Sequence, residues 1–246
     1  MTKFVAVDGI RGGCGATSVC ASLAWALAQR GQKVLALDFS VSNLLRLYFN
    51  HSWNDSEGWV LGFIQSGQIA PISYTSKIDY LPFGLLNEEQ RLVLEKRLNV
   101  QNNESDNNKK NALSLFKNLN HDWVLIDTSS TLLSLKALAY SLADFSISLL
   151  NPDPACATLI KQNASQSGRY FLINRFSPTF SLQQDVYRLW RSDLDNLIPV
   201  VLHADEAMSE SLAVKKTLGE YLPGSMVAHD VDTLSEWCLS LDRGVR

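Results

Sequence analysis

A glycine-rich segment joins an apolar run to a helical pattern near the start of the chain: Gly9-Ile10-Arg11-Gly12-Gly13-Cys14-Gly15-Ala16-Thr17-Ser18. Such a turn directs backbone N–H groups at a phosphate, and the start of the following helix adds its partial positive charge. Four glycines between Gly9 and Gly15 exceed what a tight turn requires. The segment therefore predicts a phosphate-binding loop rather than a simple turn, with the Thr17 hydroxyl placed to coordinate Mg²⁺.

Two classes of ligand fit this loop. Gly13-x-Gly15-x-x-Ser18, with Asp38 after the next strand, is close to a dinucleotide fingerprint, but its third position is Ser instead of Gly or Ala. The apolar run 123–126, which ends at Asp127, instead favours a P-loop NTPase. Asp127 would contact Mg²⁺ through a water molecule, although many aspartates at strand ends only cap the following turn. We therefore favour ATP and Mg²⁺ over NAD.

Short apolar runs alternate with helical patterns along the whole chain. Strands are predicted at 3–8, 33–38, 78–82, 122–127, 145–150, 169–174 and 197–202. Helices are predicted at 16–30, 43–49, 86–99, 111–120, 131–142, 155–166, 180–195, 206–217 and 229–241. This alternation predicts an α/β fold with a doubly wound, mostly parallel sheet and helices on both faces.

Length and composition limit the alternatives. We interpret the 246 residues as a single nucleotide-binding domain, 1–246, with a polar, flexible insertion at 99–111. A hydrophobic fraction of 46% excludes a disordered chain. A net charge of −3 lacks the basic excess of a nucleic-acid-binding protein, so no nucleic-acid partner is expected.

Cysteine usage and hydropathy predict a cytoplasmic protein. Four dispersed cysteines and the lack of a leader pattern indicate reduced thiols. Leu234, Trp237, Cys238 and Leu241 share one face of the last predicted helix. Acidic residues offset the arginines beside that face, so we expect the helix to pack on the domain and not to anchor a membrane.

The glycine loop resembles the deviant Walker A loop, K-G-G-x-G-K-T-[ST], of the MinD/ParA family of dimeric ATPases, and the resemblance covers nearly the whole chain. Further matches are a first switch at 38–40, a second switch at Asp127-Thr128, the adenine-reading Asn174-Arg175, Ile198-Pro199 and Glu206-Ala207. The segments 43–47, 80–84 and 203–208 look like the cellulose-biosynthesis branch of this family.

The resemblance implies that one set of residues binds ATP. This set comprises Arg11, Gly12, Gly13, Cys14, Gly15, Ala16, Thr17, Ser18, Asn174, Arg175 and Pro199. It also implies that Mg²⁺ is held by Thr17 directly and by Asp127 through water.

The chain departs from the family at charged positions. Ala16 replaces the loop lysine, Ser40 replaces the aspartate that positions the attacking water, and Ser129 and Thr131 replace a proline and a glycine. Arg11 stands where the family lysine reaches across the dimer, although a solvent-facing arginine is the alternative reading. Losing a charge-assisted contact costs about 1.5–3 kcal/mol. We therefore expect binding to survive, and hydrolysis, which depends on such charges, to be weak or absent.

The resemblance also implies partners and a role. It points to a homodimeric accessory protein of bacterial cellulose biosynthesis and secretion, in which ATP acts mainly as dimer glue. Expected partners are a small companion subunit (BcsR) and other secretion components, including the membrane synthase complex, which would recruit the protein to the inner membrane or cell pole. The alternatives are an active ATPase of the ParA/MinD type that positions cargo and a dinucleotide-dependent oxidoreductase.

Overall fold

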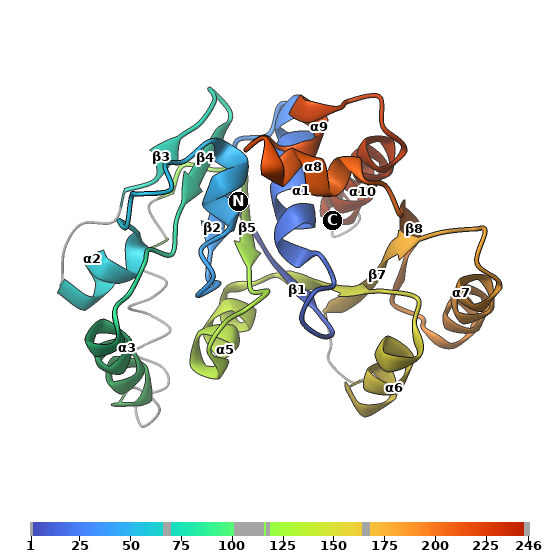
Figure 1. Cartoon of the computed structure of the whole chain (residues 1–246), viewed down its shortest axis with the longest axis horizontal. Helices are drawn as coiled ribbons and strands as arrows, with labels where there is room; N and C mark the ends of the chain where they lie inside the picture. The colour runs from blue at the N-terminus through green and yellow to red at the C-terminus, as the bar shows by residue number, and fades with distance from the viewer. Residues whose placement is uncertain (1, 66–69, 101–115, 117–118, 164–167, 244–246) are drawn as a thin grey trace.

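Eight strands form one sheet within the described part of the chain. The structure, a computed structural model, describes residues 2–65, 70–100, 116, 119–163 and 168–243. The strand order is β3-β4-β2-β5-β1-β6-β7-β8, and every pairing is parallel except that of β3 with β4 (Figure 1). The strands are β1 (Lys3–Gly9), β2 (Val34–Asp38), β3 (Ile72–Ser73), β4 (Ile78–Leu81), β5 (Trp123–Asp127), β6 (Phe145–Leu150), β7 (Arg169–Phe176) and β8 (Leu197–His203).

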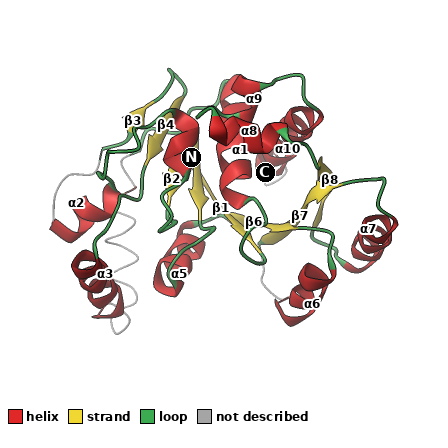
Figure 2. Cartoon of the chain, in the orientation of Figure 1, coloured by secondary structure: helices red, strands yellow, loops and turns green. Residues whose placement is uncertain are grey.

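Helices cover both faces of this sheet (Figure 2). One face carries α1, α8, α9 and α10, and the opposite face carries α3, α5, α6 and α7 (Figure 1). The helices are α1 (Ala16–Gln29), the 3₁₀ helix η1 (Leu45–Phe49), α2 (Trp59–Gln65), α3 (Glu88–Val100), α5 (Leu133–Leu142), α6 (Pro154–Asn163), α7 (Ser181–Asp193), α8 (Ala207–Ala213), α9 (Leu218–Tyr221) and α10 (Met226–Arg243). This arrangement confirms the predicted doubly wound α/β fold.

Side chains alternate between two cores along the central strands. On β2, Val34 and Ala36 join the core under α1, whereas Leu35 and Leu37 join the core under α3 and α5. Strand β5 alternates in the same way. Because both faces are covered, these strands are apolar throughout, which explains why they appear in the sequence as continuous hydrophobic runs.

Several predicted boundaries were wrong. The predicted helix 206–217 is interrupted after α8, where Lys215 adopts a left-handed φ of 58° and α9 begins anew. The helix predicted at 43–49 is the 3₁₀ helix η1, and α10 starts three residues earlier than predicted, at Met226. The short elements β3, α2 and α9 were not predicted.

The polar insertion predicted at 99–111 overlaps the end of helix α3. Residues 99 and 100 complete α3, and residues 101–111 lie outside the described residues. The helix predicted at 111–120 also falls largely outside them, and the helix predicted at 155–166 is described only up to the end of α6.

The backbone of the loop before α2 lies directly against the backbone of the loop after β4. A β-carbon built on Gly58 would lie 2.2 Å from the backbone nitrogen of Gly84. Gly84 itself has a φ of +100°. Only glycine fits this contact, which fastens the start of α2 to the end of β4.

Helix α10 packs on the domain, as the sequence predicts. Leu234 and Cys238 are fully buried, and Trp237 packs its ring edge-on against Tyr170 and Phe145. No helix in the described ranges is both long and apolar enough to cross a membrane.

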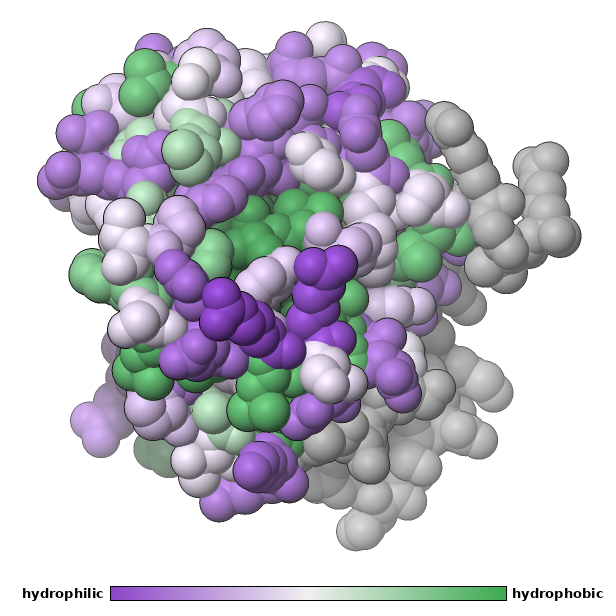
Figure 3. Space-filling view, turned by 90° about the vertical axis from the view of Figure 1, so that its right-hand side faces the viewer, coloured by the Kyte–Doolittle hydropathy of each residue, from purple (hydrophilic) through white to green (hydrophobic). Residues whose placement is uncertain are grey.

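The side of the molecule that carries α6 and α7 has a mixed surface. Figure 3 shows hydrophilic and hydrophobic residues interspersed on this side. A hollow between α6 and α7 has an apolar lining that includes Ile160, Leu189 and Leu194.

Candidate functional site

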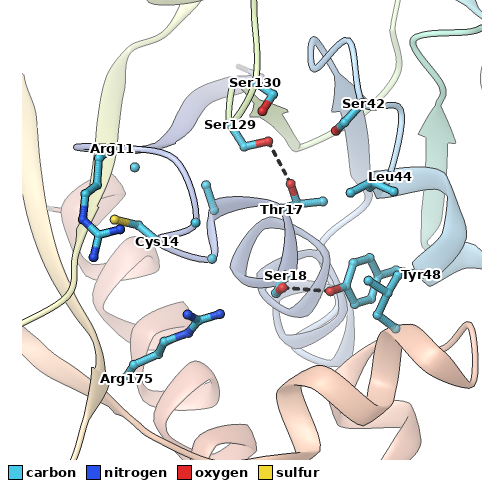
Figure 4. Close-up of a pocket in the computed structure, with 15 residues that line it drawn as sticks. Arg11, Cys14, Thr17, Ser18, Ser42, Leu44, Tyr48, Ser129, Ser130 and Arg175 are labelled. Carbon is cyan, nitrogen blue, oxygen red and sulfur yellow. Dashed lines mark hydrogen bonds between the residues drawn. The ribbon is translucent and has the colours of Figure 1, made fainter.

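A pocket of ≈ 250 Å³ opens beside the glycine loop (Figure 4). The loop follows the carboxyl end of β1 and leads into α1, at the edge of a parallel sheet where ligands generally bind. The loop contributes Gly9, Arg11, Gly13, Cys14, Gly15, Ala16, Thr17 and Ser18, and other segments contribute Ser42, Leu44, Tyr48, Ser129, Ser130, Arg175 and Leu212.

The loop's backbone requires glycine at two positions. Gly13 has a φ of +81° and Gly15 a φ of +93°, in the left-handed region that disfavours other residues. A β-carbon on Gly15 would also lie 2.6 Å from Asn174 Nδ2. By contrast, a β-carbon on Gly12 would meet open space. The conformation and close packing at Gly15 fix the turn that leads into α1.

Asn174 supports the loop from beneath. This residue is buried on β7, and its Nδ2 donates a 2.7 Å hydrogen bond to the Cys14 carbonyl oxygen. Asn174 is absent from the pocket lining in the described structure, whereas the neighbouring Arg175 belongs to it. The observed contact of Asn174 is thus with the loop backbone.

Thr17 and the end of β5 form the polar wall of the pocket. Thr17 Oγ1 lies 2.9 Å from Ser129 Oγ (Figure 4). The Ser129 backbone N–H donates a 3.0 Å hydrogen bond to Asp127 Oδ1. Asp127 is completely buried, and its Oδ2 finds no hydrogen-bond partner among the described residues. An orphaned buried carboxylate oxygen beside a threonine hydroxyl is a donor set suited to a hard cation such as Mg²⁺.

A second buried carboxylate lies beside the first. Asp38 and Asp127 are register partners at the ends of β2 and β5. Burial raises the pKa of Asp127, and it raises the pKa of Asp38 well above its usual range, with the negative charge of Asp127 adding to the effect. Backbone N–H groups of Ser40 and Leu45 donate to Asp38 and partly oppose this shift. Two carboxylates that resist ionisation together would ionise more readily next to a divalent cation.

Arg11 lies at the pocket rim in a pair within its own chain. Its guanidinium donates to Asp153 Oδ2 at 2.5 Å, with the two side chains 36% and 30% exposed. Asp153 immediately precedes α6, and its Oδ1 accepts the Cys156 backbone N–H at 2.8 Å. Within the described structure Arg11 is therefore neither buried nor free, because Asp153 holds its guanidinium.

Arg175 is the second cation of the pocket lining in the described structure. It follows Asn174 with a left-handed φ of 56°, and its exposed side chain points toward the start of α1 (Figure 4). A non-glycine residue in this conformation carries a backbone cost of about 1–2 kcal/mol. Pro199 lies elsewhere, exposed on the edge strand β8 and outside the described pocket lining. An edge strand is a usual place for proline in a sheet.

Sequence reasoning missed the opposite wall of the pocket. Tyr48 on η1 donates a 2.8 Å hydrogen bond to Ser18 Oγ, and burial raises the pKa of Tyr48 to about 12. Ser42 and Leu44 precede η1 and complete this wall. Two sequence signals could have pointed to this wall: Ser42 follows the first-switch segment 38–40, and Leu44 lies in the segment 43–47 that looks like the cellulose-biosynthesis branch.

Comparisons with known proteins define the family. The model of the family described as "Cellulose biosynthesis protein BcsQ" matches residues 1–239. The chain belongs to the BcsQ family. It is 36% identical over 239 residues to the BcsQ of Escherichia coli K12, covering 95% of this chain and 92% of that protein. It is also 36% identical over 245 residues to the BcsQ of Salmonella typhimurium, covering 98% and 96%.

Solved structures show that this BcsQ family member has the MinD/ParA fold. The septum site-determining protein MinD of Pyrococcus horikoshii, complexed with Mg-ADP, superposes with a TM-score of 0.77 at 21% identity, covering 98% of both chains. The ParA family ATPase of Chlorobium tepidum superposes with a TM-score of 0.68 at 15% identity, covering 96% and 99%. At these identities the likeness establishes the fold alone. It accords with the MinD/ParA resemblance in the sequence.

Proposed function

We propose that this chain is an ATP-binding, dimeric accessory protein of bacterial cellulose biosynthesis and secretion, needed for assembly or localisation of the synthase complex. One observation carries the nucleotide assignment. The glycine loop, with its two left-handed glycines, opens a pocket at the start of α1, next to a threonine hydroxyl and an orphaned buried aspartate. Family membership supports the role in cellulose biosynthesis.

The loop backbone would hold the phosphates. Residues 12–18 offer N–H groups at the start of α1, where the helix dipole favours an anion. The left-handed glycines on both sides of Cys14 allow the chain to wrap around a phosphate. Arg175 faces the same opening and supplies a positive charge that Ala16 cannot.

Thr17 and Asp127 would hold Mg²⁺, Thr17 directly and Asp127 through water. The ion would neutralise phosphate charge and orient the phosphate oxygens. Ser129 links the two residues, because its hydroxyl meets Thr17 and its N–H meets Asp127. The MinD structure of P. horikoshii, described as a complex with Mg-ADP, supports this assignment by analogy of fold.

Hydrolysis would be weak for two structural reasons. Ala16 is 3% exposed and has no charge to offer a γ-phosphate. Ser40 is fully buried and its hydroxyl lies 2.8 Å from that of Ser42, so it is not a free base for an attacking water. Removing a transition-state charge and a water-positioning group lowers the rate far more than the affinity.

Bound ATP would then act mainly as dimer glue. Two nucleotides that face each other across a subunit interface repel, and a cation from each subunit must lie between them. Arg11 is at the position that crosses to the partner in the resembling family, and its planar fork suits bidentate phosphate contact. We further propose a companion subunit (BcsR) and contact with the membrane synthase complex, which would bring a cytoplasmic protein to the inner membrane or cell pole.

Binding, turnover and assembly test this proposal together. Calorimetry with Mg·ATP should show binding to wild type and none to Gly15→Ala. Phosphate release should stay far below the roughly 1–100 s⁻¹ of phosphoryl-transfer enzymes, and sedimentation should show an ATP-dependent dimer. Rapid turnover would favour the cargo-positioning ATPase instead, and tighter binding of NADH than of ATP would favour the oxidoreductase.

A cellular experiment tests the pathway. A strain of the source bacterium that lacks this chain should stop secreting cellulose. Wild type should restore secretion and Gly15→Ala should not. Full restoration by Gly15→Ala would separate the cellulose role from nucleotide binding and overturn the proposal that ATP is required.

A further inference from the structure

Asn174 holds the centre of the glycine loop from outside the pocket. Its side chain is 4% exposed on β7, and its Nδ2 lies 2.7 Å from the Cys14 carbonyl oxygen. A carbonyl oxygen only accepts hydrogen bonds, so the atom that faces it must be the donating amide nitrogen. Cys14 belongs to the pocket lining, whereas Asn174 is not among the lining residues of the described structure. The amide therefore acts on the loop backbone from the side opposite to the ligand.

This hydrogen bond fixes the direction of one N–H group of the loop. The Cys14 carbonyl and the Gly15 N–H belong to one peptide unit, and the described part of the chain has no cis peptide bond. In a trans peptide unit the C=O and N–H bonds point in opposite directions. Because the Cys14 carbonyl points toward Asn174 on β7, the Gly15 N–H points away from β7, on the side of the pocket that Gly15 lines.

Gly15 also sets the start of α1. It is the N-cap residue of this helix, with a left-handed φ of +93°, and it has no side chain to cap the first turn. Nothing on this residue therefore competes with a ligand for the N–H groups that open the helix. A β-carbon here would lie 2.6 Å from Asn174 Nδ2. The glycine thus makes room for the amide, and the two residues together determine the turn.

A strained turn in β7 separates the roles of Asn174 and Arg175. The pairing of β7 with β8 shifts register between Ile173 and Phe176. Arg175 lies inside this irregularity with a left-handed φ of 56°. Bulges often change the direction of a side chain next to a functional site, and a non-glycine residue keeps this conformation only where its surroundings hold it. The amide of Asn174 contacts the loop, whereas Arg175 lines the pocket.

We propose that Asn174 is a positioning residue that aims the Gly15 N–H at a phosphate of the bound nucleotide, instead of reading the adenine base. This role rests on the proposed function, because it requires a nucleotide in the pocket. Loss of the amide should free the peptide between Cys14 and Gly15 to turn, and the Gly15 N–H should then leave the phosphate. We expect the affinity for a triphosphate to fall roughly tenfold, the effect of losing one hydrogen bond to a charged group.

Two ligands separate the phosphates from the base. Calorimetry measures the binding of Mg·ATP and of magnesium tripolyphosphate, which has no base, to wild type and to Asn174→Ala. The substitution should weaken the binding of both ligands by the same factor. It should also leave the ratio of ATP affinity to GTP affinity unchanged, because the lost contact is to the loop and not to the base.

An isosteric variant tests the donated hydrogen bond itself. Asn174→Asp keeps the shape of the side chain, but an ionised carboxylate only accepts hydrogen bonds and cannot bind the Cys14 carbonyl. The affinity of Asn174→Asp relative to wild type should be low at alkaline pH. It should recover as the pH falls, because the protonated acid can donate its O–H to the carbonyl. Asn174→Ala should show no such recovery.

A matched control removes a similar bond at the other end of β7. Asn196 Nδ2 donates a 2.6 Å hydrogen bond to the Arg169 carbonyl oxygen. Asn196→Ala should also lower the Tm, but it should leave the affinities for both ligands at their wild-type values. Circular dichroism checks that each variant is folded at the temperature of the binding measurement. Equal weakening of binding by Asn196→Ala and Asn174→Ala would show that Asn174 contributes only general stability.

Different results would overturn different parts. If Asn174→Ala weakens Mg·ATP binding but not tripolyphosphate binding, or lowers the ratio of ATP affinity to GTP affinity, Asn174 reads the base. The positioning role then fails while the nucleotide function stands. Unchanged binding of both ligands to folded Asn174→Ala would also refute the positioning role. If wild type binds neither ligand, the proposed function fails, and the positioning role fails with it.

Discussion

Release of Arg11 from Asp153 should tighten an ATP-linked dimer. The Asp153→Asn substitution removes the carboxylate charge that holds the guanidinium, while an asparagine oxygen can still accept the Cys156 N–H and cap α6. With its side chains 36% and 30% exposed, the pair is worth about 0.2–1 kcal/mol. If Arg11 must break this pair to contact the partner's nucleotide, Asp153→Asn should strengthen the contact by up to about fivefold per site.

Substitution of the other member of the pair, Arg11, should weaken the ATP-linked dimer. Arg11→Ala loses a phosphate contact of about 1.5–3 kcal/mol and no longer has to break the Asp153 pair. The net loss is therefore about 0.5–3 kcal/mol per site. Linkage requires the substitution to weaken both dimerisation and ATP binding. Arg11→Lys should retain part of the effect, because it keeps the charge and loses the fork.

Sedimentation with ATP titrated at fixed protein concentration measures these effects in a double-mutant cycle. Asp153→Asn should tighten the dimer in the wild-type background and have no further effect in Arg11→Ala. Circular dichroism checks that α6 is intact in each variant. Weaker dimerisation in Asp153→Asn, or an equal response to that substitution in both backgrounds, would refute the trans role of Arg11.

Three further predictions concern the loop and the metal. Thr17→Ala should weaken Mg·ATP binding in calorimetry with an unchanged circular dichroism spectrum, whereas Thr17→Ser should retain Mg·ATP binding. Unchanged ATP affinity after chelation of Mg²⁺ would show that the metal-binding roles of Thr17 and Asp127 are wrong. Gly15→Ala should lower the Tm by several degrees because its β-carbon would meet Asn174 at 2.6 Å, while Gly12→Ala, which meets open space, should shift it little. The metal-free protein should lose stability as pH rises above about 4, because the folded pKa of Asp127 is raised above the unfolded value of 3.8 and the stabilising protonated form is then lost. Asp127→Asn should reduce this dependence, leaving the part that buried Asp38 contributes, and should raise the Tm near pH 7. It should also remove the rise in Tm that Mg²⁺ gives to ATP-bound wild type; a pH profile identical to wild type would contradict the assignment.

The sequence predicts what local pattern determines. The loop, the helix after it and the run that ends at Asp127 are each continuous segments with a strong periodic or compositional signal. The alternation of strands and helices predicts a parallel sheet, and the loop must then lie at the edge formed by the carboxyl ends of the strands. Elements such as β3, two residues long, and α9, four residues long, are too short to show a period.

Contacts between distant segments could not be predicted in the same way. The resemblance to the MinD/ParA family predicts that Asn174 reads adenine. Its observed hydrogen bond is to the Cys14 carbonyl, a contact that depends on how β7 packs beneath the loop. The Arg11–Asp153 pair likewise depends on the position of α6 beside the loop. Ser129 differs from the family pattern in the sequence, but only the fold shows that its hydroxyl meets Thr17.

The contact between Gly58 and Gly84 limits how this protein can evolve. Any side chain at position 58 would overlap backbone atoms of residue 84, so no trimming of a neighbouring side chain makes room for it. A substitution at residue 84 adds a second β-carbon to the same space. No substitution there can therefore compensate for one at Gly58. A library of all single substitutions should therefore be depleted of every variant at Gly58, while Gly224, which has open space around it, accepts many. Natural variation in this region must then occur as changes in the lengths of the two loops, since the residues at which their backbones touch must both remain glycine.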